Sequence, residues 1–159
     1  MNLDTVYCRT PLGTVEIIGD DAGILSIHFY DKNIKPSIII PVSLQKCVIQ
    51  LDEYFQKKRK AFDLKLNPQG TDFQKQVWLE LQEIPFGKTI TYLDQSKRME
   101  NIKAIRAIAS ANGKNPIGIV IPCHRVIGSD GSLTGYAGGI WRKKWMLEHE
   151  SPSKQTSLF

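Results

Sequence analysis

The sequence has no long apolar run. Its longest purely apolar stretches, such as 38–40 and 119–121, are far shorter than the about 20 apolar residues that a membrane-spanning helix needs. The polar start, MNLDTVYCRT, contains no apolar segment typical of a secretion signal. We therefore expect a protein that functions in the cytoplasm and has no membrane partner.

Cysteine is also scarce. The three cysteines stand at positions 8, 47 and 123, an odd number without a CxxC spacing, which indicates neither a disulfide framework nor a zinc site built on cysteine pairs. A glycine-rich phosphate loop and a cluster with metal-ligand spacing are both lacking. We therefore expect reduced thiols, no cofactor and no metal, with Cys8 and Cys47 as small core residues.

A strong excess of one charge sign is absent as well. The formal net charge is +5, from 21 Lys and Arg against 16 Asp and Glu. Residues 1–69 carry nine basic against eight acidic side chains, whereas residues 70–159 carry twelve against eight. The second part is thus the better candidate for an anionic partner, although charge alone favours the simpler interpretation of a solvated basic face.

The first part of the chain has a strand pattern followed by a helical one. Three β-rich runs, TVYCRT, GTVEIIG and ILSIHFY, are separated by turn sequences, which predicts a hairpin meander over the first thirty residues. Apolar residues then recur at helical spacing over 44–58, and the alternation in AFDLKL at 61–66 predicts a further strand. We place a domain boundary at 67–70, so that residues 1–69 form a small α/β domain.

The second part opens with the start signal of a helix. Thr71 and Gln74 have the spacing of a capping box ahead of an apolar helical pattern. Two short helices, at 93–99 and 101–112, are predicted to follow around a tight turn, which is the pattern of a helix-turn-helix. In the second of them one face carries Lys103, Arg106, Ser110 and Lys114, and the opposite, inward side carries Ile102, Ile105 and Ala109.

This face of basic and small residues is what docking on nucleic acid requires. Cations reach the phosphates, and small side chains let the helix backbone come close to the DNA. The alternative is an exposed helix with ordinary lysines, and the short basic helix by itself favours this alternative.

The segment IPCHRVIGSDG, residues 121–131, places a cysteine directly before a histidine. Adjacent side chains of an extended strand point to opposite faces, so Cys123 and His124 can act together only where the strand ends or bends. Pro122 and the glycine turn at 128–131 predict such a place.

Residues 71–150 resemble the O6-alkylguanine-DNA alkyltransferase family, also called methylated-DNA-protein-cysteine methyltransferases. The resemblance rests on PCHRV (122–126), GYAGG (135–139), NGKNP (112–116), FGKTITY (86–92) and LEHE (147–150). It implies an α/β protein with a mixed α/β N-terminal domain over 1–69 that is RNase H-like and a mainly helical C-terminal domain over 70–150 with a DNA-binding helix-turn-helix. The polar, proline-containing start of residues 151–159 predicts a flexible tail.

By this resemblance the protein moves an alkyl group from O6 of guanine in DNA to the Cys123 thiolate, once per molecule, and O4-alkylthymine stays open as a second substrate. A free cysteine is mostly thiol at neutral pH and needs a base. The resemblance assigns that role to His124, acting through a water and oriented by Glu150. Tyr92 is the expected general acid toward the base ring.

The alternative is a non-catalytic alkyltransferase-like protein that binds the lesion and recruits other factors. A cysteine at position 123 disfavours this alternative, because such relatives usually have tryptophan there. A zinc site made by Cys8, Cys47 and His28, as in some relatives, is less favoured than a core role for these residues, since their spacing is not that of metal ligands.

The resemblance also assigns the partner and the remaining site residues. The partner is double-stranded DNA with alkylated guanine, bound by a monomer through the minor groove with little sequence preference, and the target nucleotide is rotated out of the stack. Arg106 takes the space that the base leaves, and Asn115 ties the DNA-binding helix to the active-site strand. Many relatives have serine at the position of Ala137, so here only a main-chain amide donates. The expected DNA contacts are Arg106, Lys103, Ala107, Ser110, Lys114 and Arg125, and the expected pocket residues are Asn115, Tyr136, Ala137, Pro122 and Val126.

The last five residues, Gln155-Thr156-Ser157-Leu158-Phe159, resemble the pentapeptide by which bacterial repair and replication proteins bind the sliding clamp. A glutamine and a Leu-Phe pair suit a short linear motif with two apolar anchors. We therefore hypothesise a bacterial, nucleoid-associated protein whose tail docks on the clamp. The alternative is that Leu158 and Phe159 pack on the protein's own surface or are chance residues.

Overall fold

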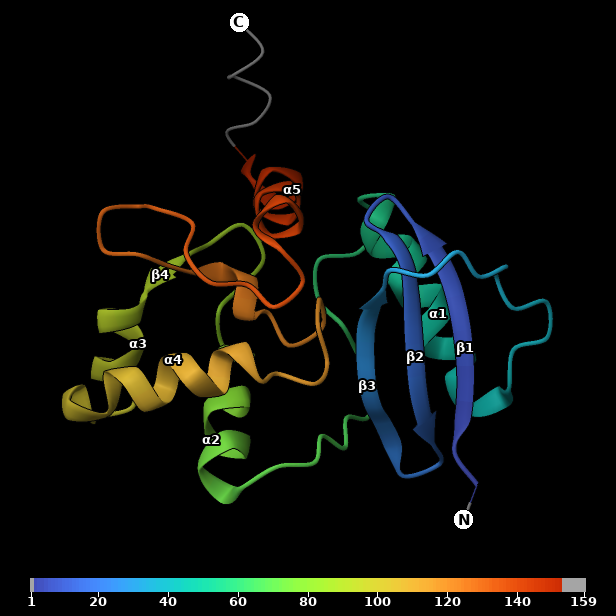
Figure 1. Ribbon diagram of the computed structural model, residues 1–159, viewed down its shortest axis with the longest axis horizontal. Helices are drawn as coiled ribbons and strands as arrows, with labels where there is room; N and C mark the ends of the chain where they lie inside the picture. Colours follow the sequence, from blue (N-terminus) through green and yellow to red (C-terminus); the bar gives the residue numbers. More distant parts are fainter. Residues whose placement is uncertain (1, 153–159) are drawn as a thin grey trace, which may run out of the picture. The chain divides into compact units, whose positions relative to one another are not determined.

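The computed structural model describes residues 2–152 and divides into two units (Figure 1). The first comprises the chain up to Gly70 together with Pro116–Val120, and the second comprises Thr71–Asn115 together with the chain from Ile121 onward. The short segment 116–120, which lies inside the range 70–150, is thus grouped with the first unit.

Three antiparallel strands form the sheet of the first unit and confirm the predicted meander. Their order in the sheet is that of the chain, β1 (Asp4–Thr10), β2 (Gly13–Asp20) and β3 (Gly23–Tyr30). Gly13 closes the first turn at φ 98, a conformation that residues with a Cβ rarely adopt. Val6, Val15, Ile17 and Ile27 alternate with more exposed residues along their strands and are fully or almost fully buried, which gives the sheet one apolar face.

Helix α1 (Val42–Phe55) packs on this sheet, and each of the three strands contacts it. Leu44, Cys47, Leu51 and Tyr54 recur at helical spacing and are all buried, as the periodicity predicted. The helix ends at Phe55, before the predicted position 58, because Lys57 takes the left-handed conformation at φ 61. Because it is buried, Cys47 is a core residue, as expected, and Cys8 on β1 is partly buried.

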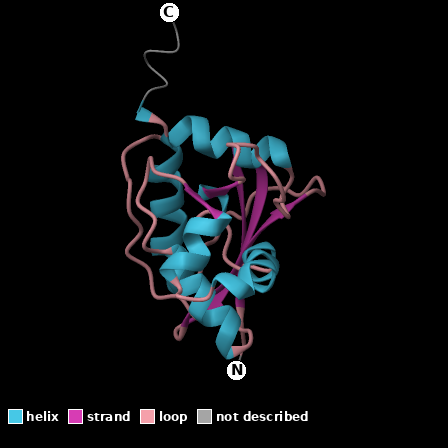
Figure 2. Ribbon diagram, turned by 90° about the vertical axis from the view of Figure 1, so that its left-hand side faces the viewer, coloured by secondary structure: helices cyan, strands magenta, loops and turns pink. Residues whose placement is uncertain are grey.

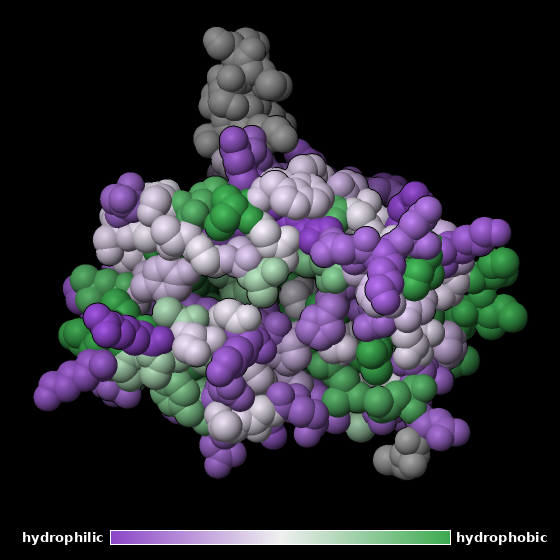
Figure 3. All heavy atoms as spheres, in the orientation of Figure 1, coloured by the Kyte–Doolittle hydropathy of each residue, from purple (hydrophilic) through white to green (hydrophobic). Residues whose placement is uncertain are grey.

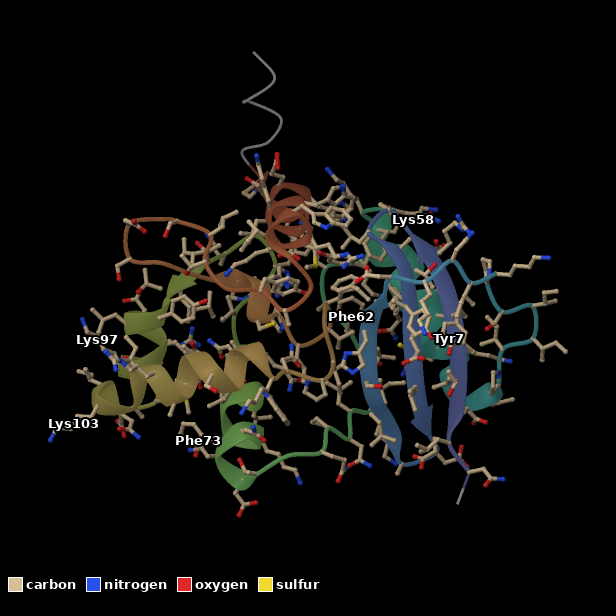
Figure 4. The ribbon with its side chains drawn as sticks, in the orientation of Figure 1. Tyr7, Lys58, Phe62, Phe73, Lys97 and Lys103 are labelled. Atoms are coloured by element: carbon tan, nitrogen blue, oxygen red, sulfur yellow. The ribbon has the colours of Figure 1, made fainter. Side chains whose placement is uncertain are left out.

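The predicted strand at 61–66 is wrong in extent. The structure contains only an isolated bridge between Leu66 and Ile24. The cause lies in Gln50 of α1, whose side-chain amide donates to the Asp63 carbonyl and whose oxygen accepts from the Asp63 N–H, at 3.1 and 2.9 Å. These backbone groups are then not available to a sheet. Phe62, labelled in Figure 4, packs against Tyr54 with the two ring centroids 5.6 Å apart.

A segment distant in sequence continues the edge of β3. The Ile27 N–H donates to the Pro116 carbonyl at 2.9 Å, and the Gly118 N–H donates to the Ile27 carbonyl at 3.1 Å. Ile117 and Ile119 are fully buried. Ile119 has a φ of 71, which is unusual for a β-branched residue.

The second unit consists mainly of helices and loops (Figure 2). Helix α2 (Asp72–Leu81) begins at the predicted capping box of Thr71 and Gln74. Its Trp78 is buried and donates from Nε1 to the Ala111 carbonyl at 2.8 Å, which fixes α2 against α4. The other elements are β4 (Ile90–Thr91), α3 (Tyr92–Arg98), η1 (Ile102–Ala104), α4 (Ile105–Gly113), η2 (Cys123–Arg125), β5 (Val126–Ile127) and α5 (Ile140–Glu150).

The predicted helix-turn-helix is present as α3 and α4. Glu100 makes the tight turn between them at φ 55, and the single 3-10 turn η1 precedes α4. The expected inward face needs correction, because Ile102 is 55% exposed whereas Ile108 is fully buried. The reason is that η1 has a tighter winding than an α-helix, so an α-helical periodicity extrapolated back to 102 points to the wrong side.

A reciprocal amide pair joins α3 to α4. Gln95 donates to the Asn112 side-chain oxygen at 2.8 Å, and Asn112 donates to the Gln95 side-chain oxygen at 2.7 Å. Both residues are buried. Two polar groups that satisfy each other in the interior specify one geometry, because any other leaves them unpaired.

We predict that Gln95→Leu or Asn112→Leu alone lowers the free energy of unfolding by about 1–3 kcal/mol, since each leaves one buried amide unpaired. The double variant should lose less than the sum of the two. Urea unfolding measures this, with the exposed Gln82→Leu on the same unit as control, expected within about 0.5 kcal/mol of the wild type. Additive losses would contradict the reciprocal pairing.

Candidate active site

The cysteine of the PCHR motif lies on a single 3-10 turn. This turn, η2, runs from Cys123 to Arg125 and ends where β5 begins at Val126. The bend that the sequence required between Cys123 and His124 is therefore present. Cys123 is partly exposed, whereas the side chains of His124 and Arg125 are turned into the interior of the unit. The expected pocket residues Pro122 and Val126 flank the turn and are both buried.

Asn115 connects the end of α4 to this turn. Its side-chain amide donates to the Ile121 carbonyl at 2.8 Å and to Cys123 Sγ at 3.3 Å. The resemblance had assigned Asn115 to tie the DNA-binding helix to the active-site strand, and the structure places its amide within hydrogen-bond distance of the cysteine sulfur. A hydrogen bond donated to sulfur favours the thiolate over the thiol.

His124, Glu150 and Arg125 form a buried charged cluster beside the cysteine. His124 Nε2 lies 2.7 Å from Glu150 Oε2, and Arg125 Nε donates to Glu150 Oε1, also at 2.7 Å. The exposed fractions of the three residues are 0%, 3% and 6% for His124, Glu150 and Arg125. His124 Nδ1 has no hydrogen-bond partner among the described residues. Each carboxylate oxygen of Glu150 is therefore committed to a different neighbour.

The burial of these groups sets their protonation. Burial raises the pKa of the Cys123 thiol, and the Asn115 hydrogen bond and the Lys143 charge oppose this only in part. Burial lowers the pKa of His124, against the opposing effect of Glu150. Burial would raise the pKa of Glu150, but its hydrogen bonds and charges from His124 and Arg125 outweigh burial and lower it. At neutral pH the site therefore holds a thiol, a neutral imidazole and a carboxylate.

Lys143 of α5 is a functional candidate that the sequence analysis missed. It is fully buried, and its Nζ donates to the Thr134 carbonyl at 3.0 Å. Its charge lowers the pKa of Cys123, which places the ammonium near the thiol. The signal was present in the sequence, because Lys143, Met146 and Glu150 fall at helical spacing on one face of α5 and are all buried. The sequence analysis assigned no role to Lys143.

Tyr92 shares an acceptor with Lys143. The Tyr92 hydroxyl donates to the same Thr134 carbonyl at 3.1 Å, and Lys143 Nζ lies 5.9 Å from the centroid of the tyrosine ring. Burial raises the pKa of Tyr92, and the nearby Cys123 adds to this. The hydroxyl therefore stays protonated at neutral pH and keeps a proton to donate.

The two pocket residues of the GYAGG motif differ in burial. The pKa of Tyr136 is raised well above its usual value, mainly by burial and then by the charge of the Cys123 thiolate. Ala137 is exposed. The loop that carries both residues, 128–139, connects β5 to α5 without a helix or strand.

The face predicted to contact DNA is exposed on α4 and the turn before it. Lys103, Arg106, Ala107, Ser110 and Lys114 are all exposed. Lys97 and Lys103 extend from the end of this unit at which α3 and α4 are joined, and hydrophilic side chains gather there (Figures 3 and 4). Lys97, Glu100, Asn101, Ile102 and Lys103 line a hollow beside the turn.

Arg125, which was expected to contact DNA, lies in the interior of the second unit. Arg125 is only 6% exposed. Besides Glu150 it donates from Nη1 to the Ile84 carbonyl at 2.7 Å, and its guanidinium lies 5.8 Å from the centroid of the Phe86 ring. Burial and two short hydrogen bonds therefore fix its guanidinium inside this unit.

Neither a metal cluster nor a membrane helix is found in the part of the chain that the structure describes. Within residues 2–152 no three His, Cys, Asp or Glu side chains gather as metal ligands would. Over the same residues no helix is long and apolar enough to cross a membrane.

Both parts of the chain match known family models. The model described as "6-O-methylguanine DNA methyltransferase, ribonuclease-like domain" matches residues 4–68, and "6-O-methylguanine DNA methyltransferase, DNA binding domain" matches residues 72–152. The chain belongs to the 6-O-methylguanine DNA methyltransferase family.

Individual relatives agree with this assignment. A methylated-DNA-protein-cysteine methyltransferase of Methanosarcina acetivorans is 43% identical over 149 residues, covering 89% of this chain and 94% of the relative. One of Mycobacterium tuberculosis is 39% identical over 160 residues, covering 96% and 97%. The crystal structure of Mycobacterium tuberculosis O6-methylguanine methyltransferase has a TM-score of 0.83 at 35% identity, covering 99% of this chain and 100% of that one. The Mycobacterium tuberculosis protein in complex with DNA has a TM-score of 0.82 at 36% identity, covering 96% and 98%.

Proposed function

We propose that this protein is a methylated-DNA-protein-cysteine methyltransferase that repairs O6-alkylguanine in DNA by moving the alkyl group permanently to Cys123. The observation that carries the proposal is a cysteine on a bend next to a buried histidine that is itself paired with a buried carboxylate. The family membership and the relatives' names support the same activity.

The resting charges explain how the thiol is activated. Glu150 accepts from His124 Nε2–H, so that Nδ1 carries the lone pair of the neutral imidazole. Nδ1 can then take the thiol proton through a water as the nucleophile attacks. Because the pKa of Cys123 is raised by burial, we expect the thiolate to form during the reaction rather than before it.

The displacement changes the charge on the sulfur and on the guanine, and both changes must be compensated. The sulfur forms a bond to the alkyl carbon, the bond between that carbon and O6 breaks, and its electron pair stays on the guanine. Tyr92 is suited to donate a proton to the ring, provided that its hydroxyl leaves the Thr134 carbonyl. The step leaves the thiol proton on His124, a proton from Tyr92 on guanine and the alkyl group on sulfur. The imidazolium then releases one proton to solvent and Tyr92 takes one up, so the net change is the loss of one proton by the thiol and the gain of one by guanine.

Lys143 supplies the positive charge that a buried thiolate needs. Its ammonium is fully buried and raises the stability of negative charge at Cys123. A charge fixed before the reaction stabilises the developing anion without reorganisation. We assign Lys143 this electrostatic role beside the His124 base.

The DNA-bound state follows from the exposed face of α4. We propose that a monomer binds double-stranded DNA through the minor groove by Lys103, Arg106, Ala107, Ser110 and Lys114, and that Arg106 fills the space of the rotated nucleotide. The exposure of all these residues supports this. Contacts mainly to phosphates imply little sequence preference and weaker binding at higher salt. The alternative of a non-catalytic lesion-binding protein is disfavoured, because the thiol and its base are both in place.

We predict stoichiometric repair. After exposure to excess O6-methylguanine DNA, intact mass should rise by about 14 Da, one CH₂, and the added methyl should map to Cys123. Cys123→Ser should abolish transfer and keep DNA binding, because a neutral hydroxyl is a much weaker nucleophile. The controls Cys8→Ser and Cys47→Ser should keep transfer. Recovery of many repaired lesions per protein molecule would overturn the single-turnover mechanism.

We predict that Arg106→Ala slows repair in duplex DNA about tenfold or more, because the flipped state loses the side chain that holds it open. Reaction with free O6-benzylguanine should change much less. Single-turnover rates on both substrates measure the split. The matched control, Lys103→Ala on the same face, should weaken binding and reduce the salt dependence instead. Equal losses of rate on both substrates would place Arg106 in the pocket.

The proposed clamp motif, Gln155–Phe159, lies outside the described residues. We propose that it tethers the protein to a bacterial sliding clamp on the nucleoid, which would raise its local concentration on newly replicated DNA. The relatives from mycobacteria support a bacterial setting. A SKQTSLF peptide should bind purified clamp more tightly than a peptide with Leu158 and Phe159 replaced by alanine. Equal binding would disprove the tether and leave the repair function intact.

A further inference from the structure

We infer that Arg125 is a positioning residue of the thiol-activating cluster, which holds the Glu150 carboxylate and thereby keeps His124 as a neutral base. The inference rests on the proposed function for its meaning in repair. Its geometric basis is independent of that function, because it consists of the contacts of Arg125 within the second unit.

The guanidinium of Arg125 is fixed on several sides. Nε donates to Glu150 Oε1 at 2.7 Å, Nη1 donates to the Ile84 carbonyl at 2.7 Å, and the Phe86 ring lies 5.8 Å from the guanidinium carbon. A buried arginine with two short hydrogen bonds has little freedom to reach another partner. It therefore fixes the position of the carboxylate to which it donates.

The two carboxylate oxygens of Glu150 have different hydrogen-bond partners. Oε1 accepts from Arg125, which leaves Oε2, 2.7 Å from His124 Nε2, as the acceptor for the imidazole N–H. This hydrogen bond selects the tautomer with the proton on Nε2. Nδ1, which has no hydrogen-bond partner among the described residues, is then the basic nitrogen.

The charge of Arg125 matters as much as its geometry. A buried carboxylate with a histidine as its single partner would favour imidazolium, because a buried negative charge requires a positive one. Three charged groups act on His124: Glu150 raises its pKa, and Arg125 and Lys143 lower it together with burial. The arginine supplies the counter-charge for Glu150, so the histidine does not have to.

Removing this charge should therefore protonate the base. In Arg125→Met, Glu150 loses its cationic partner and the pKa of His124 should rise by at least about one unit, the size expected for a charge a few ångströms away. Arg125→Lys keeps the positive charge and should leave the pKa of His124 near the wild-type value.

The direct test is histidine NMR on the protein without DNA. The chain has three histidines, at 28, 124 and 149, and the loss of one signal in His124→Gln identifies the relevant one. We expect titration of His124 below its ordinary range in the wild type and in Arg125→Lys, and at higher pH in Arg125→Met. The same titration midpoint in all three folded proteins would overturn the inference. Should Arg125→Met fail to fold, the titration of Glu150→Gln carries the test, because removal of the carboxylate should lower the midpoint further, and an unchanged midpoint would overturn the coupling.

The second readout is the pH profile of single-turnover repair. The limb of activity that reports the base should move to higher pH in Arg125→Met. At pH 6 the variant should then retain a smaller fraction of its own plateau rate than the wild type, by up to about tenfold for a shift of one unit, and it should recover above pH 8. A loss that is equal at every pH would show a merely structural role and overturn the inference.

A double variant separates action through Glu150 from a direct effect on His124. In a Glu150→Gln background, Arg125→Met should shift the His124 titration by less than half of its effect in the wild type, since no carboxylate remains to be compensated. An undiminished shift would overturn the route through Glu150. If the wild type transfers no methyl group at any pH, the proposed function fails, whereas the NMR titrations still decide the role of Arg125.

Discussion

The buried carboxylate of Glu150 is the interaction on which the second unit depends. An ionised carboxylate in the interior is stable only when each oxygen has a donor, and here Arg125 and His124 provide one each. Arg125 also donates to the Ile84 carbonyl. The hydrogen bonds around the Glu150 carboxylate therefore connect the end of α5, the turn η2 and the chain after α2. Gly87 shows how tight the arrangement is, because its φ is 83 and a Cβ there would lie 3.1 Å from the Glu150 carbonyl oxygen.

The same constraint explains why the site rests in an unreactive form. Burial disfavours charge on both the thiol and the imidazole, so the pKa of Cys123 is raised and that of His124 is lowered. A permanently ionised cysteine would react with any electrophile that reached it. In the proposed mechanism the nucleophile forms only as its proton is transferred, and the buried Lys143 ammonium then stabilises it.

Recognition and chemistry meet at Asn115. The exposed side of α4 carries the basic residues, while its buried side is held to α2 by Trp78 and to α3 by the pair of Gln95 and Asn112. Asn115 stands two residues after the end of this helix and donates to Cys123 Sγ. The position of the helix that is proposed to bind DNA is therefore coupled to the environment of the sulfur through one side chain.

Much of the fold and of the candidate site could be predicted from the sequence alone. The meander, the capping box at Thr71, the paired helices α3 and α4, and the bend at Cys123 follow from local periodicity, turn residues and spacing, which act between near neighbours in the chain. The resemblance of five short motifs indicated the family, and the family models matched both parts of the chain.

Tertiary structure decided the features that local sequence did not predict. Gln50 took the backbone groups of Asp63 and prevented a strand, and Lys143 and Arg125, which resemble surface cations in sequence, are buried beside Cys123 and Glu150. A single residue letter does not show whether a cation lies in water or against a distant carboxylate, because burial depends on elements that meet only when the chain has folded.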